Sequence, residues 1–293
     1  MRTFADLVLY GRDGGMTLTS NGTPAGGAEP AEIDTSKAHA ARVYDYLLGG
    51  RANFKVDREA AEITYASFPG GIDGVRADVR EHRAALGRVV RYFVEDAGIT
   101  QFLDIGTGIP KENNVHEVAQ AGEPDARIVY VDWDPIVLAH AHRLLRGTRG
   151  GAISYIYGDL HDPQPILREA AKTLDFSRPV AVMLFGILHF SSDADDPHGL
   201  VGQLLAPLPT GSGLALSHLA SDLHPEEMAE TFNRLNSRLA ESVTLRSHDE
   251  VAALLAGLEL VEPGVVQAAQ WRPAPGTATL TSQMWLGVGR KAG

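Results

Sequence analysis

A short turn that combines two glycines with an acid is the first part of the sequence whose residue types could do chemistry. Asp104-Ile105-Gly106-Thr107-Gly108 comes directly after an apolar run. Glycines at a turn from a strand into a helix let the backbone approach a ligand, and the helix then presents free N–H groups to an anion. The dinucleotide pattern G-x-G-x-x-G would need a third glycine where this chain has Lys111. The turn therefore favours a ligand with an amino-acid end over a pyrophosphate, and a purely structural turn is the alternative.

A second acid follows the next apolar run. Asp132 lies 24 residues after Gly108, close to the offset of about 20 residues at which an acid meets ribose hydroxyls. Asp134 is two residues further on and directly precedes Pro135. Proline is favoured at the start of a helix, with aspartate before it as the N-cap. Asp134 thus has a local structural role, and Asp132 is the predicted ribose ligand.

The third apolar run repeats this arrangement. Asp159 follows Tyr155-Ile156-Tyr157-Gly158, whereas Asp162 precedes Pro163 and is expected to cap the next helix. Ligands of open α/β sheets bind at the carboxyl ends of the strands. There Asp159 could accept a hydrogen bond from an adenine amino group, and a solvated loop acid is the alternative reading. Three acids at three successive strand ends favour a nucleoside site.

A histidine follows the fourth apolar run, which ends in Phe185. His189, in Leu188-His189-Phe190, titrates near neutral pH in its ordinary state and could deprotonate a hydroxyl group. The alternative is a histidine that only packs at the top of the sheet. His189 also belongs to a loop whose Asp and His residues resemble a metal-binding cluster in composition. Asp196-Pro197 in this loop is explained by the start of a helix. We therefore expect no metal site.

Strands and helices alternate from residue 101 onward, which predicts a doubly wound, mostly parallel sheet of seven strands in an α/β fold. The last two strands are expected to form a hairpin that adds an antiparallel edge. Helices are predicted at 114–121, 135–145, 163–173, 198–205, 225–239 and 247–257. The expected strands are 101–105, 127–131, 154–157, 180–185, 213–217, 258–261 and 280–287.

The first hundred residues contain no strand pattern. Residues 1–33 are rich in Gly, Thr, Pro and Ala and are expected to be a disordered leader. Apolar residues at helical spacing then predict three helices, the first of which should stop at Gly49-Gly50. We therefore predict a helical cap over residues 34–100 and a Rossmann-like binding domain over residues 101–293.

The composition excludes several classes of protein. A net charge of −11 argues against a nucleic-acid partner, because phosphate binding needs clustered Lys and Arg. No apolar run reaches the ~20 residues that a membrane helix needs, so no membrane partner is expected. The chain has no cysteine, which excludes thiolate metal sites and Cys nucleophiles. No secretory signal is recognised, and we expect a cytoplasmic protein.

The motifs at the strand ends resemble the first three cofactor motifs of class I methyltransferases. The segment 41–50, ARVYDYLLGG, is similar to the opening of an actinobacterial S-adenosylmethionine-dependent methyltransferase family that was long a domain of unknown function. Segments 113–117, 174–179 and 258–264 share this resemblance, which extends over about residues 37–290. One departure is Arg51-Ala52-Asn53, where the family often has Lys-Asp-Asn, so that Asn53 persists and an acid is lost.

The resemblance implies a Rossmann-like core that binds S-adenosyl-L-methionine beneath a helical cap. Gly106 and Gly108 would line its methionine part, Asp132 would hold the ribose, and Trp133 would lie beside the adenine. The residues expected to contact the cofactor are Asp104, Gly106, Thr107, Gly108, Asp132, Trp133, Asp159, Leu160, Phe185, Tyr46 and Asn53.

The expected reaction is methyl transfer to a small molecule, at oxygen, with His189 as the base. Methyltransferases that act on base or amide nitrogens usually have an acid or Asn followed by Pro-Pro after the fourth strand, and this chain does not. Two alternatives stay open. One is a regulatory protein that binds S-adenosylmethionine or S-adenosylhomocysteine without catalysis, and the other is an NAD(P)-dependent oxidoreductase.

Overall fold

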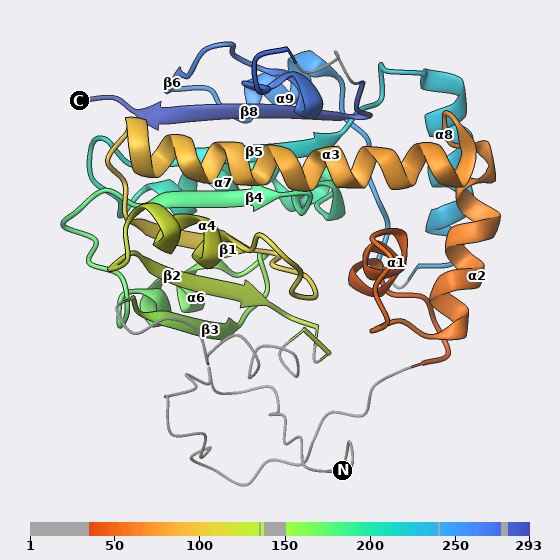
Figure 1. The fold of residues 1–293 in the computed structure, drawn as a ribbon, viewed down its shortest axis with the longest axis horizontal. Coiled ribbons are helices and arrows are strands. Elements are labelled where there is room, and N and C mark those ends of the chain that lie inside the picture. Colours follow the sequence, from red (N-terminus) through yellow and green to blue (C-terminus); the bar gives the residue numbers. More distant parts are fainter. Residues whose placement is uncertain (1–34, 135, 138–150, 240, 277–280) are drawn as a thin grey trace, which may run out of the picture.

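An eight-stranded, mostly parallel sheet forms the centre of the molecule, as Figure 1 shows. The computed structural model describes residues 35–134, 136–137, 151–239, 241–276 and 281–293. The strand order is β3-β2-β1-β4-β5-β8-β6, and β7 pairs with β8. The strands are β1 (Gln101–Ile105), β2 (Arg127–Asp132), β3 (Ile153–Tyr157), β4 (Ala181–Phe185), β5 (Gly213–Leu219), β6 (Leu258–Leu260), β7 (Val266–Gln267) and β8 (Met284–Lys291). The predicted doubly wound α/β fold is confirmed.

The end of the chain differs in detail from the expected hairpin. β8 pairs antiparallel with both β5 and β6, so it lies between them, and β6 is the edge strand. The eighth strand, β7, is only two residues long. Such a short strand has no readable alternation of apolar and polar residues, which is why the sequence predicts seven strands rather than eight.

Helices cover both faces of the sheet (Figure 1). One face packs against α3 (Gly71–Arg91), the π-helical turn η3 (Tyr92–Asp96), α4 (Val115–Gly122) and the 3-10 turn η6 (Ala268–Gln270). The other face packs against α6 (Pro163–Ala170), α7 (Pro197–Leu205) and α9 (His248–Ala253). The strands are therefore buried on both sides, and ligands can reach them only at their ends.

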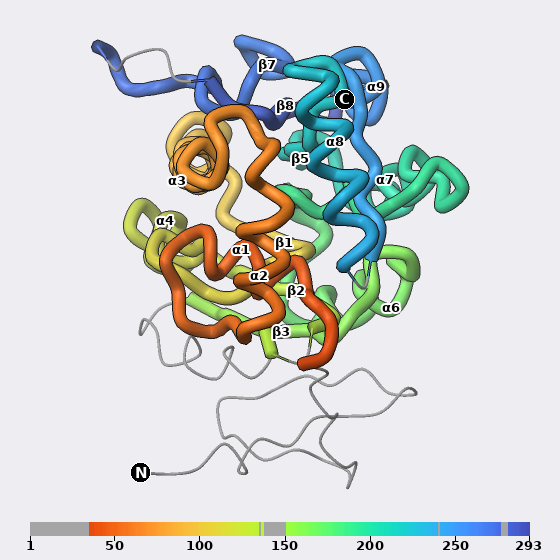
Figure 2. The backbone as a smooth tube through the Cα atoms, turned by 90° about the vertical axis from the view of Figure 1, so that its right-hand side faces the viewer, coloured from red at the N-terminus to blue at the C-terminus, as the bar shows by residue number. Residues whose placement is uncertain are grey.

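A helical cap lies beyond the carboxyl ends of the parallel strands, as the views in Figures 1 and 2 agree. It consists of α1 (Ala40–Leu47), α2 (Lys55–Thr64), the 3-10 turn η2 (Tyr65–Ser67) and α8 (Pro225–Asn236), which share one apolar core. The start of α3 joins this core through Val75 and Val79, and its later turns pack on the sheet. The cap thus also includes a helix from late in the chain, and α3 packs against both the cap and the sheet.

Local sequence signals account for several element ends. α1 ends at Leu47, two residues before the predicted stop at Gly49-Gly50, and Gly49 supplies the left-handed residue with φ 76°. Ser247 and Glu250 form the expected capping box of α9. The leader at 1–33 and most of the predicted helix at 135–145 lie outside the described residues.

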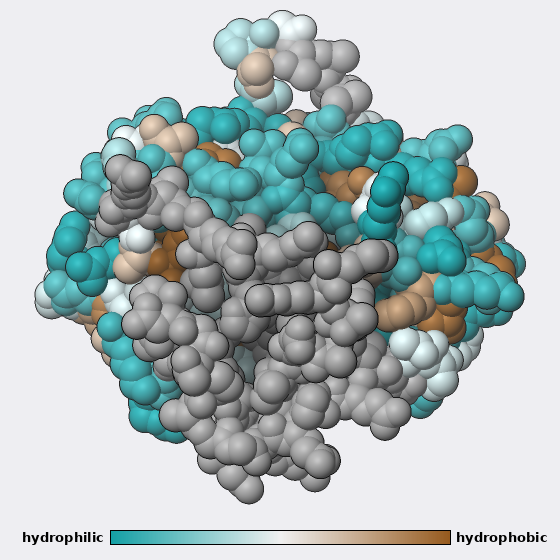
Figure 3. Space-filling model, turned by 60° about the horizontal axis from the view of Figure 1, so that its bottom comes forward, coloured by the Kyte–Doolittle hydropathy of each residue, from teal (hydrophilic) through white to brown (hydrophobic). Residues whose placement is uncertain are grey.

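Exposed apolar residues are scattered on the face of the molecule shown in Figure 3, where they form small separate areas among hydrophilic ones. Among the described residues, no helix combines the length and hydrophobicity of a membrane span. The exposed large apolar side chains come from several elements: Phe54, Ile63, Trp133, Tyr157 and Leu260.

Candidate functional site

A cavity of about 180 Å³ lies between the carboxyl ends of the strands and the cap. One part is bounded by the glycine turn (residues 104–108) and by Asp132 and Trp133. The other part, here called the apolar chamber, is enclosed by side chains of α1, η2, α3 and α8 and of the segment before α9. The chamber residues are Val43, Leu47, Tyr65, Phe68, Val75, Val79, Phe232, Leu235, Leu239 and Val243. One cavity thus joins a polar cradle to an apolar compartment.

The glycine turn follows β1 and is held against β2. The N–H groups of Gly106 and Thr107 donate to the Val131 carbonyl at 2.9 and 3.3 Å. Gly106 has φ 77°, and a Cβ there would come within 2.6 Å of Ile187 Cγ1. Only glycine fits this position without displacing Ile187. The turn therefore brings bare backbone to the cavity, as the sequence predicted.

Asp132 ties the glycine turn to the end of β2. One carboxylate oxygen accepts from the Gly108 N–H at 2.8 Å and the other from the Asp134 N–H at 2.9 Å. Burial raises the pKa of Asp132 to about 6. Each oxygen has a further lone pair, so a diol at this edge of the cavity could donate to it.

Asp134 has the local role predicted for it. Its carboxylate accepts from the Ile136 N–H at 2.8 Å and pairs with His39 Nδ1 at 3.0 Å. Burial lowers the pKa of His39, but the hydrogen bond and charge of Asp134 outweigh that effect and leave the pKa raised. The His39 ring lies 5.6 Å from the ring of Trp133, which is 37% exposed at the cavity. An exposed aromatic face is thus available beside Asp132.

Asp104 and Arg83 form the charged wall beneath the glycine turn. Burial raises the pKa of Asp104 to about 7, with Arg83 opposing the shift and Asp132 adding to it. Arg83, on α3, donates to the carbonyls of Glu112 and Asn113 at 3.1 and 3.2 Å and lines the cavity. Sequence reasoning missed Arg83, because it is one of five arginines in α3 and no local pattern distinguishes it from the others.

His189 reaches the cavity from the 3-10 turn η4 (Leu188–Phe190) after β4. The side chain is buried, and its Nδ1 has no hydrogen-bond partner within the described part of the chain. Burial lowers the pKa of His189 well below its usual value, and the charges of His218, His82 and Arg246 add to this effect. The imidazole is therefore neutral near pH 7.

A second histidine, which the sequence did not single out, lies beside the first. His82 Nε2 is 2.7 Å from Ser217 Oγ, and its Nδ1 is 3.2 Å from the Tyr44 hydroxyl. Burial lowers the pKa of His82 to about 3. A Cβ at Gly186 would approach the His82 and His189 rings at 3.3 and 3.7 Å, so both rings surround the end of β4.

Eight predicted site residues thus meet at the cavity: Asp104, Gly106, Thr107, Gly108, Asp132, Trp133, Phe185 and His189. The other four are not among the residues that line it. Asp159 is exposed and pairs with His161 Nδ1 at 2.8 Å, and Leu160 packs into the core behind the sheet. The Tyr46 hydroxyl contacts Glu62 and accepts from Arg76. Asn53 donates to the Asp45 carboxylate at 2.7 Å.

The loop rich in Asp and His after His189 serves local structure. Asp196 caps α7 by accepting from the Gly199 N–H at 3.0 Å, and Asp193 pairs with Arg246 at 2.7 Å. Within the described ranges, no three His, Asp or Glu side chains are grouped so that they could hold a metal ion.

Comparison with known proteins finds relatives that match this chain over most of its length. A family model described as S-adenosyl methyltransferase matches residues 26–292. A crystal structure of a DUF574 family protein from Streptomyces avermitilis is 41% identical, with a TM-score of 0.83 over 89% of this chain and 100% of its own. A candidate methyltransferase from Thermobifida fusca is 38% identical, with a TM-score of 0.81 over 90% and 98% of the two chains. No curated protein matches the chain. These similarities include the cap as well as the sheet.

Proposed function

Because this chain belongs to the S-adenosyl methyltransferase family, we propose that it transfers the methyl group of S-adenosyl-L-methionine to an oxygen of a small, largely apolar molecule. One observation carries this proposal. A single cavity joins the glycine turn and Asp132 to the apolar chamber, and His189 lies in its wall.

The residues at the polar end of the cavity fit the cofactor. Gly106 leaves room that a side chain would fill, and Gly108 has open space where its Cβ would be. Asp104, Gly106, Thr107 and Gly108 would hold the methionine part, Asp132 the ribose and Trp133 the adenine. When bound, S-adenosyl-L-methionine supplies an electrophilic methyl group on a sulfonium. The protein's contribution is then to align an acceptor and exclude water.

The size and lining of the cavity favour a small acceptor. The chamber is covered by α1, η2 and α8, and the whole cavity of about 180 Å³ is far too small for a folded macromolecule. Aromatic and aliphatic side chains around the reacting centre remove water, which strengthens every polar contact inside. The acceptor would enter the chamber and present its nucleophile near the end of β4.

His189 is the residue proposed to take the proton. A neutral imidazole can accept a hydrogen bond from a hydroxyl group and receive its proton as the oxygen attacks. The lowered pKa makes His189 a weak base at rest. We therefore expect proton transfer to accompany methyl transfer rather than to precede it, so that no free alkoxide forms.

Two experiments test this proposal. Calorimetric titration with S-adenosylmethionine, S-adenosylhomocysteine and NADPH tests which cofactor the protein binds. Transfer of radiolabelled methyl groups to a panel of phenols and alcohols tests the reaction. We expect binding of the first two ligands only, and labelled product that His189→Ala reduces about 10²-fold or more. Tighter binding of NADPH would refute the cofactor site. Tight binding of S-adenosylmethionine without methyl transfer to any acceptor would favour a regulatory protein.

A further inference from the structure

A buried carboxylate, that of Asp78, lies in the wall of the apolar chamber. Asp78 lies on α3, three residues after Val75 and four before His82, so it shares a helix face with both. It is only 6% exposed and lines the cavity. One of its oxygens accepts from the Gln283 N–H at 2.9 Å. Nothing in the proposed methyl transfer uses this group.

Among the described residues, the carboxylate has no positively charged partner. Its interactions are hydrogen bonds with Ser282 and Gln283 and repulsion from Glu81, and no described residue forms an ion pair with it. Burial raises the pKa of Asp78 to about 6, so it is still ionised at pH 8. A buried carboxylate without a counter-ion is costly unless a ligand supplies one.

The charges around the cavity make this side attractive to cations. Among the described residues that line the cavity, Arg83 is the only Lys or Arg, and its guanidinium is engaged beside the glycine turn. Burial raises the pKa of Tyr65, and the charge of Asp78 adds to this shift. Burial also raises the pKa of Tyr44, where Arg83 opposes the shift and Asp78 adds to it, so the charge of Asp78 acts across the cavity. A carboxylate on the acceptor would meet repulsion there without a compensating cation.

We propose that Asp78 determines acceptor specificity by pairing with a cationic nitrogen, so that the acceptor is an apolar amine. This rests on the proposed function, because it assigns the chamber to the acceptor. The methylated oxygen would lie toward His189, and the ammonium toward the start of β8. A purely structural Asp78, which only anchors Gln283, would not discriminate between acceptors of different charge.

Three probes that share a phenol ring and a two-carbon chain test this. Tyramine carries an ammonium, 4-ethylphenol is neutral and 3-(4-hydroxyphenyl)propionate carries a carboxylate. We expect tyramine to bind the wild-type protein, saturated with S-adenosylhomocysteine at pH 8, about tenfold or more tighter than 4-ethylphenol, with the propionate weakest. Equal affinities, a reversed order or no binding of any probe would overturn the assignment of Asp78.

The variant Asp78→Asn removes the charge and keeps an oxygen for the Gln283 N–H. It should lose the preference for tyramine and bind S-adenosylhomocysteine as the wild type does. Asp73→Asn, on the same helix with its side chain 89% exposed, is the matched control and should keep the preference. A tyramine preference that survives in Asp78→Asn refutes the inference. Failure of the wild type to bind S-adenosylhomocysteine would instead refute the proposed function and the inference together.

Discussion

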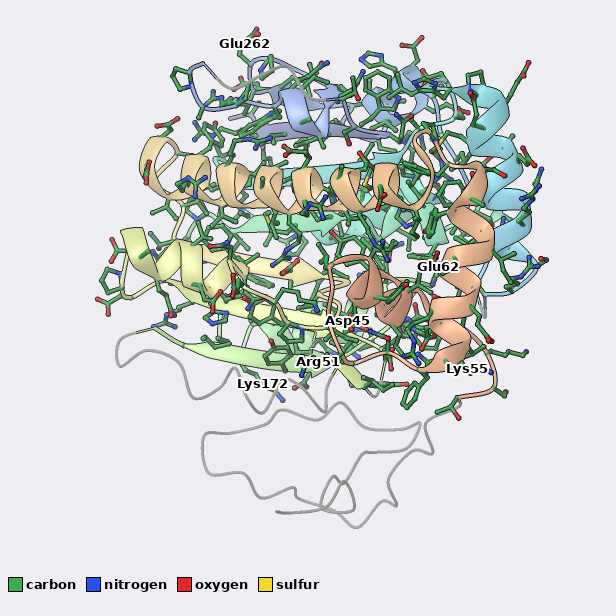
Figure 4. All side chains as sticks on the ribbon, turned by 45° about the vertical axis from the view of Figure 1, so that its right-hand side comes forward. Asp45, Arg51, Lys55, Glu62, Lys172 and Glu262 are labelled. Carbon is green, nitrogen blue, oxygen red and sulfur yellow. The ribbon has the colours of Figure 1, made fainter. Side chains whose placement is uncertain are left out.

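The ammonium of Lys111 contacts the buried carboxylate of Asp45, and this ion pair joins α1 of the cap to the loop that follows the glycine turn. Figure 4 shows Asp45 on α1, near Arg51. Asp45 also accepts from the Ala52 N–H at 2.9 Å. A Cβ at Gly50 would overlap both charged groups, so this glycine lets the pair form. Lys111 thus occupies the place of a third glycine for a structural reason.

Lys111→Met should destabilise the protein, because it leaves the Asp45 carboxylate buried and uncompensated. Asp45 is 1% exposed and Lys111 22%, so we expect a loss of ~3 kcal/mol in the free energy of unfolding, measured with urea. Lys55→Met is the matched control, because Lys55 pairs with Glu59 at 81% and 58% exposure. The control should change stability by about 0.5 kcal/mol or less. Equal losses in the two variants would show that the buried pair has no special role.

Gly106→Ala should weaken binding of S-adenosylmethionine about tenfold or more, because the new methyl group must displace Ile187 or the turn. Gly98 also has a positive φ, 66°, but its Cβ would meet nothing within 4 Å. Gly98→Ala therefore introduces only backbone strain, which should lower the free energy of unfolding by about 1 kcal/mol. Calorimetric titration of both variants separates the two effects. Similar affinities in the two would mean that contact with Ile187 does not matter for binding.

The strand ends could be predicted from the sequence because their signals are local. Pro135 alone distinguishes the role of Asp134 from that of Asp132, and the structure shows the Asp134 carboxylate accepting from the Ile136 N–H. Glycine at 106 likewise indicates a turn within a few residues of a strand. These are interactions between chain neighbours, so no knowledge of the tertiary structure was needed.

The wall formed by α3 could not be predicted in the same way. Asp78, His82 and Arg83 reach the cavity because α3 begins at the cap and then crosses the sheet, which is a property of the tertiary structure. Along the sequence they are ordinary polar residues in a helix. The same holds for α8, which joins the cap about 180 residues after α1. Residues brought together by distant elements leave no short-range pattern.

Binding of S-adenosylmethionine should strengthen as the pH rises from 5.5 to 8. Burial raises the pKa of Asp104 to about 7 and of Asp132 to about 6, so both lose protons in this range and become anions. The cofactor carries a net positive charge, which S-adenosylhomocysteine lacks. We expect a gain in affinity on the order of tenfold for S-adenosylmethionine and a smaller one for S-adenosylhomocysteine.

Titration calorimetry at both pH values measures this difference. Asp104→Asn should weaken the pH dependence and leave only the part due to Asp132, whereas the exposed Asp73→Asn should leave it unchanged. If the affinity of the wild type for S-adenosylmethionine is the same at pH 5.5 and pH 8, these two carboxylates do not act on the sulfonium.

Replacing His82 by glutamine should make the protein lose less stability than the wild type as the pH is lowered. Burial lowers the pKa of His82 to about 3 in the folded state, whereas an unfolded histidine titrates near 6.5. Below about pH 6.5 the unfolded wild type binds a proton that the folded state does not, so wild-type stability falls as the pH falls. Glutamine keeps a donor and an acceptor for Ser217 and Tyr44 but cannot titrate.

We therefore subtract the unfolding free energy of the wild type from that of His82→Gln. As the pH is lowered below 6.5, this difference should rise by about 1.4 kcal/mol for each pH unit, and above pH 7 it should stay constant. Any loss of packing in the variant adds a constant offset without changing this slope. Urea unfolding at pH 7.5, 6.0 and 5.0 measures it, with the exposed His198→Gln as a control for removing an imidazole. A difference that stays flat down to pH 5 would mean that His82 is protonated in the folded protein, contrary to its burial between Ser217 and Tyr44.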